Sequence, residues 1–284
     1  MTTGSAKLAG VIGWPVAHSL SPRLHVYWLR EHKIDGAYVP LAVRREDFAT
    51  VIDGLQRAGF AGVNVTVPHK EAAFALAHET DETARAAGAA NLLLFRSDGR
   101  IQARNTDVLG LMQSLNEELD AKAFRGRPVV ILGAGGAARA AVLALDRLGA
   151  AEIHIVSRNL GRAEALASML KDHVTAPIRC FAWNEWPQAA GEAALLVNAT
   201  SAGMRGSPSL DLSVEGLPSG ASVCDLIYNP LETELLKRAR ARSLKTINGL
   251  GMLMHQAVPA FEAFYGVRPA VTPELRAQLE KAPA

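Results

Sequence analysis

The chain has 284 residues, a length that favours about two domains rather than a single hydrophobic core. Apolar residues make up 49% of it, which predicts a folded α/β protein and excludes intrinsic disorder. The formal net charge is only +2, and no long run of lysine or arginine occurs. We therefore expect a small-molecule ligand, and neither nucleic acid nor a membrane surface as a partner.

The two cysteines, Cys180 and Cys224, lie far apart and lack the spacing of metal ligands, so we interpret both as small core residues. Unpaired thiols are typical of a reducing compartment. The amino terminus lacks the basic start and long apolar centre of a signal peptide, and no apolar run reaches the roughly 18 residues that span a bilayer. These features predict a cytoplasmic protein.

The first hundred residues alternate between strand and helix patterns. Strands are expected at 8–12, 38–43 and 62–67, with helices after Ser21-Pro22, at 48–58 and at 70–78. This order indicates a parallel sheet. Residues 91–95 and 100–103 then predict an antiparallel hairpin that turns at Asp98-Gly99.

A second series of strands and helices begins after a helix at 110–119. The strands are expected at 129–132, 152–156, 194–198 and 221–226, and the helices at 139–148, 161–171 and 232–242. A long helical pattern from Met252 to Tyr265 follows, and the order of elements does not assign it to either domain. The fold class is therefore α/β with two domains.

A glycine-rich loop joins the first strand and helix of the second series. Residues 129–138 read VVILGAGGAA, which matches G-x-G-x-x-A. The first glycine permits a tight turn, the second lets the backbone approach a pyrophosphate, and Ala138 allows close packing of the helix. An ordinary tight turn is the alternative, but the flanking strand and helix favour a dinucleotide site made by Gly133, Ala134, Gly135, Gly136 and Ala137.

The next strand predicts which dinucleotide binds. An NAD site has an acidic residue about 20 residues after the glycine loop, where it binds the ribose 2′-hydroxyl. Residues 153–162 read IHIVSRNLGR and contain no acid, whereas Arg158 and Arg162 suit a 2′-phosphate. The pattern favours NADP over NAD, with two solvated surface arginines as the alternative.

The segment NVTVPHK, residues 64–70, ends in a lysine where a helix should begin. Its valines, Val63, Val65 and Val67, alternate with Asn64 and Thr66, so we expect the valines on one face and a ligand on the other.

Lys70 itself lies at the positive end of a helix dipole, which disfavours its charge, so it can act as a base or a proton relay. Asp107 is the expected partner; a solvated lysine is the alternative.

Eight short blocks follow one another along the chain: GWPVAHSLSP (13–22), NVTVPHK (64–70), AGAAN (87–91), NTD (105–107), GAGGAAR (133–139), NATSAGM (198–204), DLIYNPLET (225–233) and GLGMLMHQA (249–257). Their order and spacing resemble those of shikimate dehydrogenases over nearly the whole chain. NVTVP-x-K together with S-x-S-P is quite specific to that family.

The resemblance implies an enzyme with its active site between two domains: a substrate domain of residues 1–108 completed by 252–284, and a Rossmann-like NADP domain of residues 109–251. The implied reaction is the reversible NADP-linked reduction of 3-dehydroshikimate to shikimate in aromatic amino acid biosynthesis, without a metal. Lys70 and Asp107 would form the catalytic pair. The implied substrate contacts are Ser19, Ser21, Asn64, Thr66, Asn91, Tyr228 and Gln256. The implied cofactor contacts beyond the glycine loop are Ser157, Arg158, Asn159, Arg162, Asn198, Thr200, Leu226 and Gly249.

Leu92, Arg104 and Val108 depart from the family pattern at the rim of the implied pocket. Quinate or an amino-substituted shikimate as substrate, NAD as cofactor, and a non-catalytic dinucleotide-binding sensor therefore stay open, as do a monomer and a homodimer. His69 is a second candidate for proton transfer. A surface or helix-packing role is expected for His18, His25 and His32.

Overall fold

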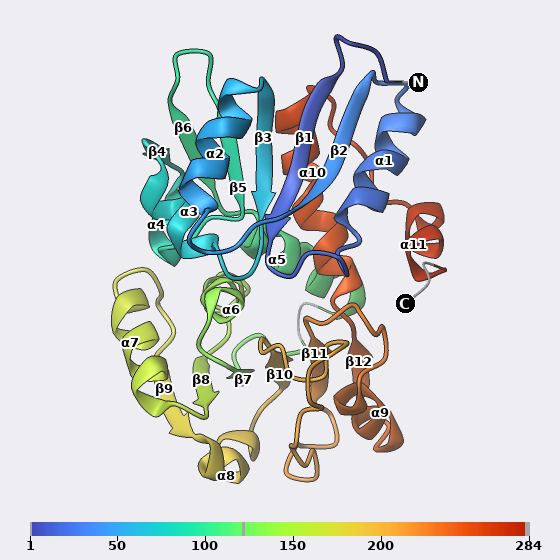
Figure 1. Ribbon diagram of the computed structural model, residues 1–284. Helices are drawn as coiled ribbons and strands as arrows, with labels where there is room; N and C mark the ends of the chain where they lie inside the picture. Colours follow the sequence, from blue (N-terminus) through green and yellow to red (C-terminus); the bar gives the residue numbers. More distant parts are fainter. Residues whose placement is uncertain (1, 121–122, 282–284) are drawn as a thin grey trace. The chain divides into compact units, whose positions relative to one another are not determined.

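Residues 2–120 and 123–281 are described by a computed structural model, in which they form two compact units (Figure 1). Unit 1 comprises the described residues up to Asp107 and those from Met254 on, and unit 2 is the inserted segment Val108–Leu253. The described part of the chain excludes residues 1 and 282–284, which belong to the first predicted domain. It also excludes residues 121–122, which belong to the second.

The sheet of unit 1 is mixed, with the strand order β2-β1-β3-β5-β6-β4. Its first three strands are parallel, as the alternating pattern predicts, and β5 and β6 form the expected antiparallel hairpin. The hairpin joins β3 in antiparallel register. The strands are β1 (Lys7–Gly13), β2 (Gly36–Ala42), β3 (Phe60–Val65), β4 (Glu79–Thr80), β5 (Leu92–Phe95) and β6 (Ile101–Arg104).

Helices cover both faces of this sheet; α2 and α3 lie in front of it in Figure 1 and α10 lies behind it. A buried cluster that includes Ile12, Ile52, Val63 and Leu93 fills one side. The helix pattern left unassigned by the sequence is α10, which begins within unit 2 and continues into unit 1. The helices of unit 1 are α1 (Ser21–Glu31), α2 (Phe48–Arg57), α3 (Lys70–Leu76), α4 (Glu82–Ala87), α10 (Leu250–Tyr265) and α11 (Pro273–Glu280).

The sheet of unit 2 is parallel throughout, in the order β12-β11-β10-β7-β8-β9. Its central strands are continuous apolar runs, as expected of strands that are covered on both faces. The strands are β7 (Pro128–Leu132), β8 (Glu152–Ser157), β9 (Ile178–Ala182), β10 (Leu195–Asn198), β11 (Ser222–Asp225) and β12 (Lys245–Ile247). The helices are α5 (Asp107–Glu118), α6 (Gly136–Arg147), α7 (Leu160–Leu170), α8 (Trp186–Ala190) and α9 (Glu234–Ala241), with a 3₁₀ turn at Trp183–Glu185.

The prediction for residues 62–67 was wrong at its carboxyl end. The strand ends at Val65, and Val67 is 69% exposed, so it does not share the buried face of Val63 and Val65. The two cysteines also differ, since Cys224 is buried and Cys180 only half-buried. Across residues 2–120 and 123–281, no helix combines the length and the apolar character that crossing a bilayer requires.

Candidate functional site

The topology of unit 1 gathers polar segments at one edge of its sheet. The loops that follow β1 and β3 leave the carboxyl ends of parallel strands, so they emerge at the same edge. Because β5 runs antiparallel to β3 and β6 antiparallel to β5, the start of β5 and the end of β6 lie at this edge too. The sheet therefore brings together Ser19, Thr66, Asn91 and the segment 105–107.

Lys70 and Asp107 form an ion pair at this edge. The Lys70 ammonium donates to Asp107 Oδ2 at 2.6 Å, and the two side chains are 17% and 6% exposed. Lys70 is the first residue of α3, and Asp107 is the first residue of α5. The pairing expected from the sequence is therefore present, and it is held by the two helix starts.

Asn91 holds the carboxylate from the other side. Its amide nitrogen donates to Asp107 Oδ1 at 2.9 Å and to Gln256 Oε1 at 3.0 Å, and its Oδ1 accepts the backbone N–H of Thr106 at 2.8 Å. Asn91 is 2% exposed. Four predicted site residues, Lys70, Asp107, Asn91 and Gln256, are thus linked in one network. The network also includes Thr106, which was not predicted although it lies in the NTD block.

Asn64 belongs to the same edge, because its Nδ2 donates to the Asn91 carbonyl at 3.3 Å. The predicted pair of serines lies at the start of α1, where the backbone N–H of Ser21 donates to Ser19 Oγ at 3.3 Å. Thr66 is half-buried in the loop after β3. No hydrogen bond joins these two serines to Asn64 or Lys70 within the described residues, so their role stays a prediction.

The histidines singled out in the sequence form no hydrogen bond to this network among the residues that the structure describes. His69 stacks on Phe48, with ring centroids 4.7 Å apart, and its Nε2 lies 2.8 Å from the Val43 carbonyl. Burial lowers the pKa of His69. It is a packed core histidine, which argues against the second candidate for proton transfer. His25 is fully buried, as a helix-packing role requires, while His18 is half-buried and His32 is exposed.

The glycine loop of unit 2 has the geometry that a phosphate requires. Gly133 has a φ of +102°, and a Cβ there would lie 2.9 Å from Thr200 Cγ2, so this position favours glycine. A Cβ at Gly135 would extend into open space at the amino-terminal end of α6, with no atom within 4 Å. Ala138 is fully buried. The loop therefore leaves room for an anion next to the free N–H groups of the first helical turn.

The predicted ribose-phosphate segment lies at the end of β8. Ser157 Oγ accepts the backbone N–H of Asn159, and the Asn159 side chain caps α7 by accepting the N–H of Arg162 at 3.1 Å. Arg158 and Arg162 are exposed, and neither guanidinium has an ion-pair partner among the described residues. Two fixed charges are therefore available to a ligand.

A buried carboxylate, Asp225, supports the loops on the other side of the glycine turn. It is fully buried at the end of β11 and accepts hydrogen bonds from Asn198 at 2.9 Å, from the backbone of Ile227 at 3.1 Å and from Thr233 at 2.6 Å. Burial raises its pKa, and the three donors oppose that shift. Asn198 in turn accepts from the Thr200 hydroxyl at 2.7 Å. Sequence reasoning selected Asn198 and Thr200 but missed Asp225.

The remaining predicted contacts of unit 2 lie just after β11 and β12. The N–H of Leu226 donates to the Asn198 carbonyl, and that of Gly249 donates to the Ile227 carbonyl. A Cβ at Gly249 would lie 2.0 Å from the Leu226 carbonyl oxygen, so close backbone approach requires glycine. Tyr228, which the resemblance assigned to the substrate, belongs to unit 2 and is half-buried.

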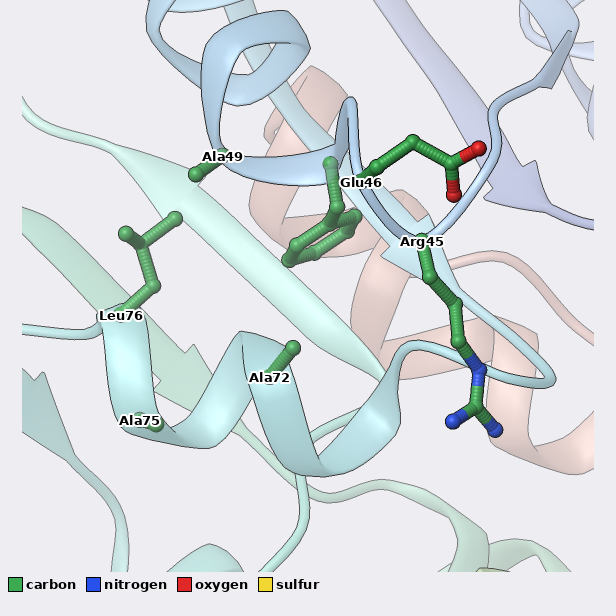
Figure 2. A pocket seen from close by; sticks show the side chains of 7 residues that line it. Arg45, Glu46, Ala49, Ala72, Ala75 and Leu76 are labelled. Atoms are coloured by element: carbon green, nitrogen blue, oxygen red, sulfur yellow. The ribbon is translucent and has the colours of Figure 1, made fainter.

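A shallow pocket of about 300 Å³ lies elsewhere on unit 1, between α3 and the segment that leads into α2 (Figure 2). Its lining is mostly apolar, and none of the predicted site residues contributes to it. Over the described ranges, no group of three or more histidine, cysteine, aspartate or glutamate residues is placed to hold a metal ion.

Two family models match the chain, one within unit 1 and one within unit 2. Residues 11–93 match the family model described as the shikimate dehydrogenase substrate binding domain, and residues 116–205 match the one described as shikimate / quinate 5-dehydrogenase. The chain is 52% identical over 278 residues to the protein named shikimate dehydrogenase (NADP(+)) from Rhodospirillum rubrum, with 98% of each chain covered. It belongs to the shikimate dehydrogenase family.

Solved structures of related proteins share the fold as well. A shikimate dehydrogenase in complex with NADP⁺ matches with a TM-score of 0.88 and 35% identity, covering 99% of this chain and 96% of that one. The quinate dehydrogenase from Corynebacterium glutamicum in complex with NAD matches with a TM-score of 0.87 and 31% identity, covering 96% and 99%. The shikimate dehydrogenase fold is thus shared by relatives that differ in substrate and cofactor.

Proposed function

We propose that this chain is an NADP-dependent shikimate dehydrogenase that interconverts 3-dehydroshikimate and shikimate. The 52% identity to a protein of that name supports the reaction. The observation that carries the proposal is the ion pair between Lys70 and Asp107, because it fixes a proton donor beside a set of hydroxyl-binding amides. Unit 1 would bind the substrate, and unit 2 would bind NADP.

The residues of unit 1 supply the proton chemistry. In reduction, the Lys70 ammonium gives its proton to the carbonyl oxygen of the substrate as that carbon gains a hydride; in oxidation, Lys70 takes the hydroxyl proton back. Asp107 holds the ammonium at 2.6 Å, and Asn91 fixes the carboxylate, so the amine is positioned before substrate arrives. Asn64, Thr66, Gln256 and the two serines offer the hydroxyls and amides that a polyhydroxylated acid needs.

The residues of unit 2 fit NADP. The open space at Gly135 and the free N–H groups of α6 suit the pyrophosphate, and the exposed Arg158 and Arg162 suit the 2′-phosphate. NADP supplies the hydride acceptor for oxidation of the substrate, and in reduced form the hydride donor. Asn198, Thr200, Leu226 and Gly249 would shape the rest of the cofactor site from the carboxyl ends of β10, β11 and β12.

The function is tested by four assays of the purified protein, with shikimate or quinate as substrate and NADP⁺ or NAD⁺ as cofactor. We expect reduced cofactor to form fastest with shikimate and NADP⁺, and none to form without the acid. Faster turnover with quinate and NAD⁺ would instead indicate the alternative that the quinate dehydrogenase match raises. Cofactor binding without turnover on either acid would indicate a dinucleotide sensor and contradict the proposed reaction.

The choice of cofactor gives a second prediction. Replacing both Arg158 and Arg162 with alanine removes two charge-assisted contacts to a 2′-phosphate, so we expect KM for NADP⁺ to rise by about 100-fold or more. KM for NAD⁺, which lacks that phosphate, should change by less than about threefold. Steady-state kinetics with each cofactor at saturating shikimate measure both values.

Arg147→Ala is the matched control, because this exposed arginine lies at the far end of α6, about 18 Å along the helix from the glycine loop. An equal rise in KM for both cofactors in the double variant would assign the arginines to some other role.

We also propose that the enzyme acts in the cytoplasm, which the two free thiols support. It would do so as a monomer or a homodimer, and light scattering of the purified protein would decide between them.

A further inference from the structure

Asn64 has an amide whose orientation its neighbours fix. The backbone carbonyl of Asn91 can only accept a hydrogen bond. The side-chain nitrogen of Asn64, and not its side-chain oxygen, must therefore face it, at 3.3 Å. Oδ1 then faces the hydroxyl of Tyr38, which donates to it at 2.8 Å. One N–H of the amide is left without a partner among the described residues, although Asn64 is only 6% exposed.

Tyr38 reaches Asn64 across a strand. Tyr38 lies on β2 and Asn64 on β3, with β1 between them. The residue in register with Tyr38 on β1 is Ala9, which is small enough for a side chain to cross it. Gly62 is in register with Ala9 on β3, and Phe264 packs against it: an added Cβ there would lie 2.9 Å from Phe264 Cε1. The tyrosine is 4% exposed, so its ring is enclosed, and its hydroxyl donates to a polar group of the site.

His25 holds the tyrosine ring from the side of α1. The two rings are stacked, with centroids 3.8 Å apart and planes 5° from parallel. Neither ring nitrogen of His25 has a hydrogen-bond partner in the described part of the chain, and the residue is fully buried. Burial lowers the pKa of His25 to about 3, so the ring is neutral at working pH and acts by packing.

We propose that Tyr38 is a positioning residue that fixes the Asn64 amide so that it presents an N–H, rather than its oxygen, to a hydroxyl or carboxylate oxygen of the substrate, with His25 holding the tyrosine ring in place. The inference rests on the proposed function, in which Asn64 contacts the substrate. Without the tyrosine hydroxyl, Asn64 Oδ1 is buried without a donor. This unsatisfied oxygen favours rotation of the amide, which would turn the oxygen toward the substrate.

A double-mutant cycle tests whether Tyr38 acts through Asn64. Tyr38→Phe, Asn64→Ala and the double variant are compared with the wild type by kcat and KM for shikimate at saturating NADP⁺. Tyr38→Phe should raise KM by about tenfold in the wild-type background, the size expected for one lost buried hydrogen bond, with kcat changed by less than about threefold. In the Asn64→Ala background, the same substitution should change KM by less than about twofold, because coupled residues are not additive.

Tyr265→Phe is the matched control. It removes the hydroxyl of another buried tyrosine of unit 1, which donates to the Ala37 carbonyl, next to Tyr38 on β2 and outside the predicted site. We expect KM for shikimate to stay within about twofold of wild type, as for a substitution away from the substrate. Thermal unfolding of every variant shows whether loss of stability explains any change in KM.

The outcomes separate the inference from the function on which it rests. Equal effects of Tyr38→Phe in the two backgrounds, or no effect in either, would overturn the inference while shikimate dehydrogenase activity stands. A wild-type protein that does not oxidise shikimate would overturn the proposed function, and the inference with it.

Discussion

Lys70→Ala is expected to lower kcat for shikimate oxidation by roughly 10²–10⁴-fold, the contribution typical of a positioned acid–base group. The loss follows from removal of the amine that exchanges a proton with the substrate hydroxyl. NADP⁺ affinity should change little, because every predicted cofactor residue belongs to unit 2 and Lys70 belongs to unit 1. Steady-state kinetics and a titration of cofactor binding measure the two effects separately.

Lys70→Arg separates the charge of this residue from its proton chemistry. A guanidinium can still pair with Asp107, but it does not release a proton at working pH. We therefore expect this variant to be about as inactive as Lys70→Ala, whereas Lys7→Ala, an exposed lysine at the start of β1, should be fully active. Activity of Lys70→Arg near that of wild type would show that only the positive charge is needed.

Asp225→Ala is expected to lower the free energy of unfolding by about 3–5 kcal/mol, because it removes a buried acceptor shared by three donors, of which only the Asn198 amide keeps a second acceptor among the described residues, the Ala202 carbonyl at 3.4 Å. These donors belong to Asn198, Ile227 and Thr233, so the loss should also loosen the turn that holds Thr200 against the glycine loop and raise KM for NADP⁺. Urea unfolding followed by circular dichroism gives the stability.

Two further variants provide reference values for this change in the free energy of unfolding. Asp225→Asn keeps an oxygen for Asn198 and Ile227, so it should cost clearly less than the alanine substitution. Asp211→Ala removes an exposed carboxylate of the same unit and should change stability by no more than about 0.5 kcal/mol. A cost for Asp225→Ala as small as that of Asp211→Ala would show that the buried network contributes little.

Local patterns predicted much of the fold because each long element has its own signal. The hairpin of β5 and β6 was predicted from Asp98-Gly99, and α6 from the glycine loop that precedes it. Short elements such as α4 and β12 were not predicted, because they have too few residues to show a hydrophobic period. The end of β3 was misplaced because Val67 continues the alternation in sequence while its side chain points to solvent.

Site residues could be predicted where they belong to one short sequence motif. Contacts between residues that are distant in sequence could mostly not be predicted. The expected partners Lys70 and Asp107 do pair, although they lie 37 positions apart. The contact of Tyr38 with Asn64 joins strands that are not neighbours, and that of Asn91 with Gln256 joins residues 165 positions apart. Neither contact leaves a pattern in the sequence. The same holds for Asp225, whose burial depends on strand order.

The insertion of unit 2 within unit 1 sets an order of events during synthesis. The ribosome makes the first 107 residues, then all of Val108–Leu253, and only afterwards most of α10. Phe261, Phe264 and Gln256 therefore emerge only after the whole of unit 2, although they complete the aromatic packing around His25 and the amide network around Asn91. The amino-terminal part of unit 1 therefore lacks this packing until α10 has been made, whereas the inserted unit can fold earlier as a separate domain.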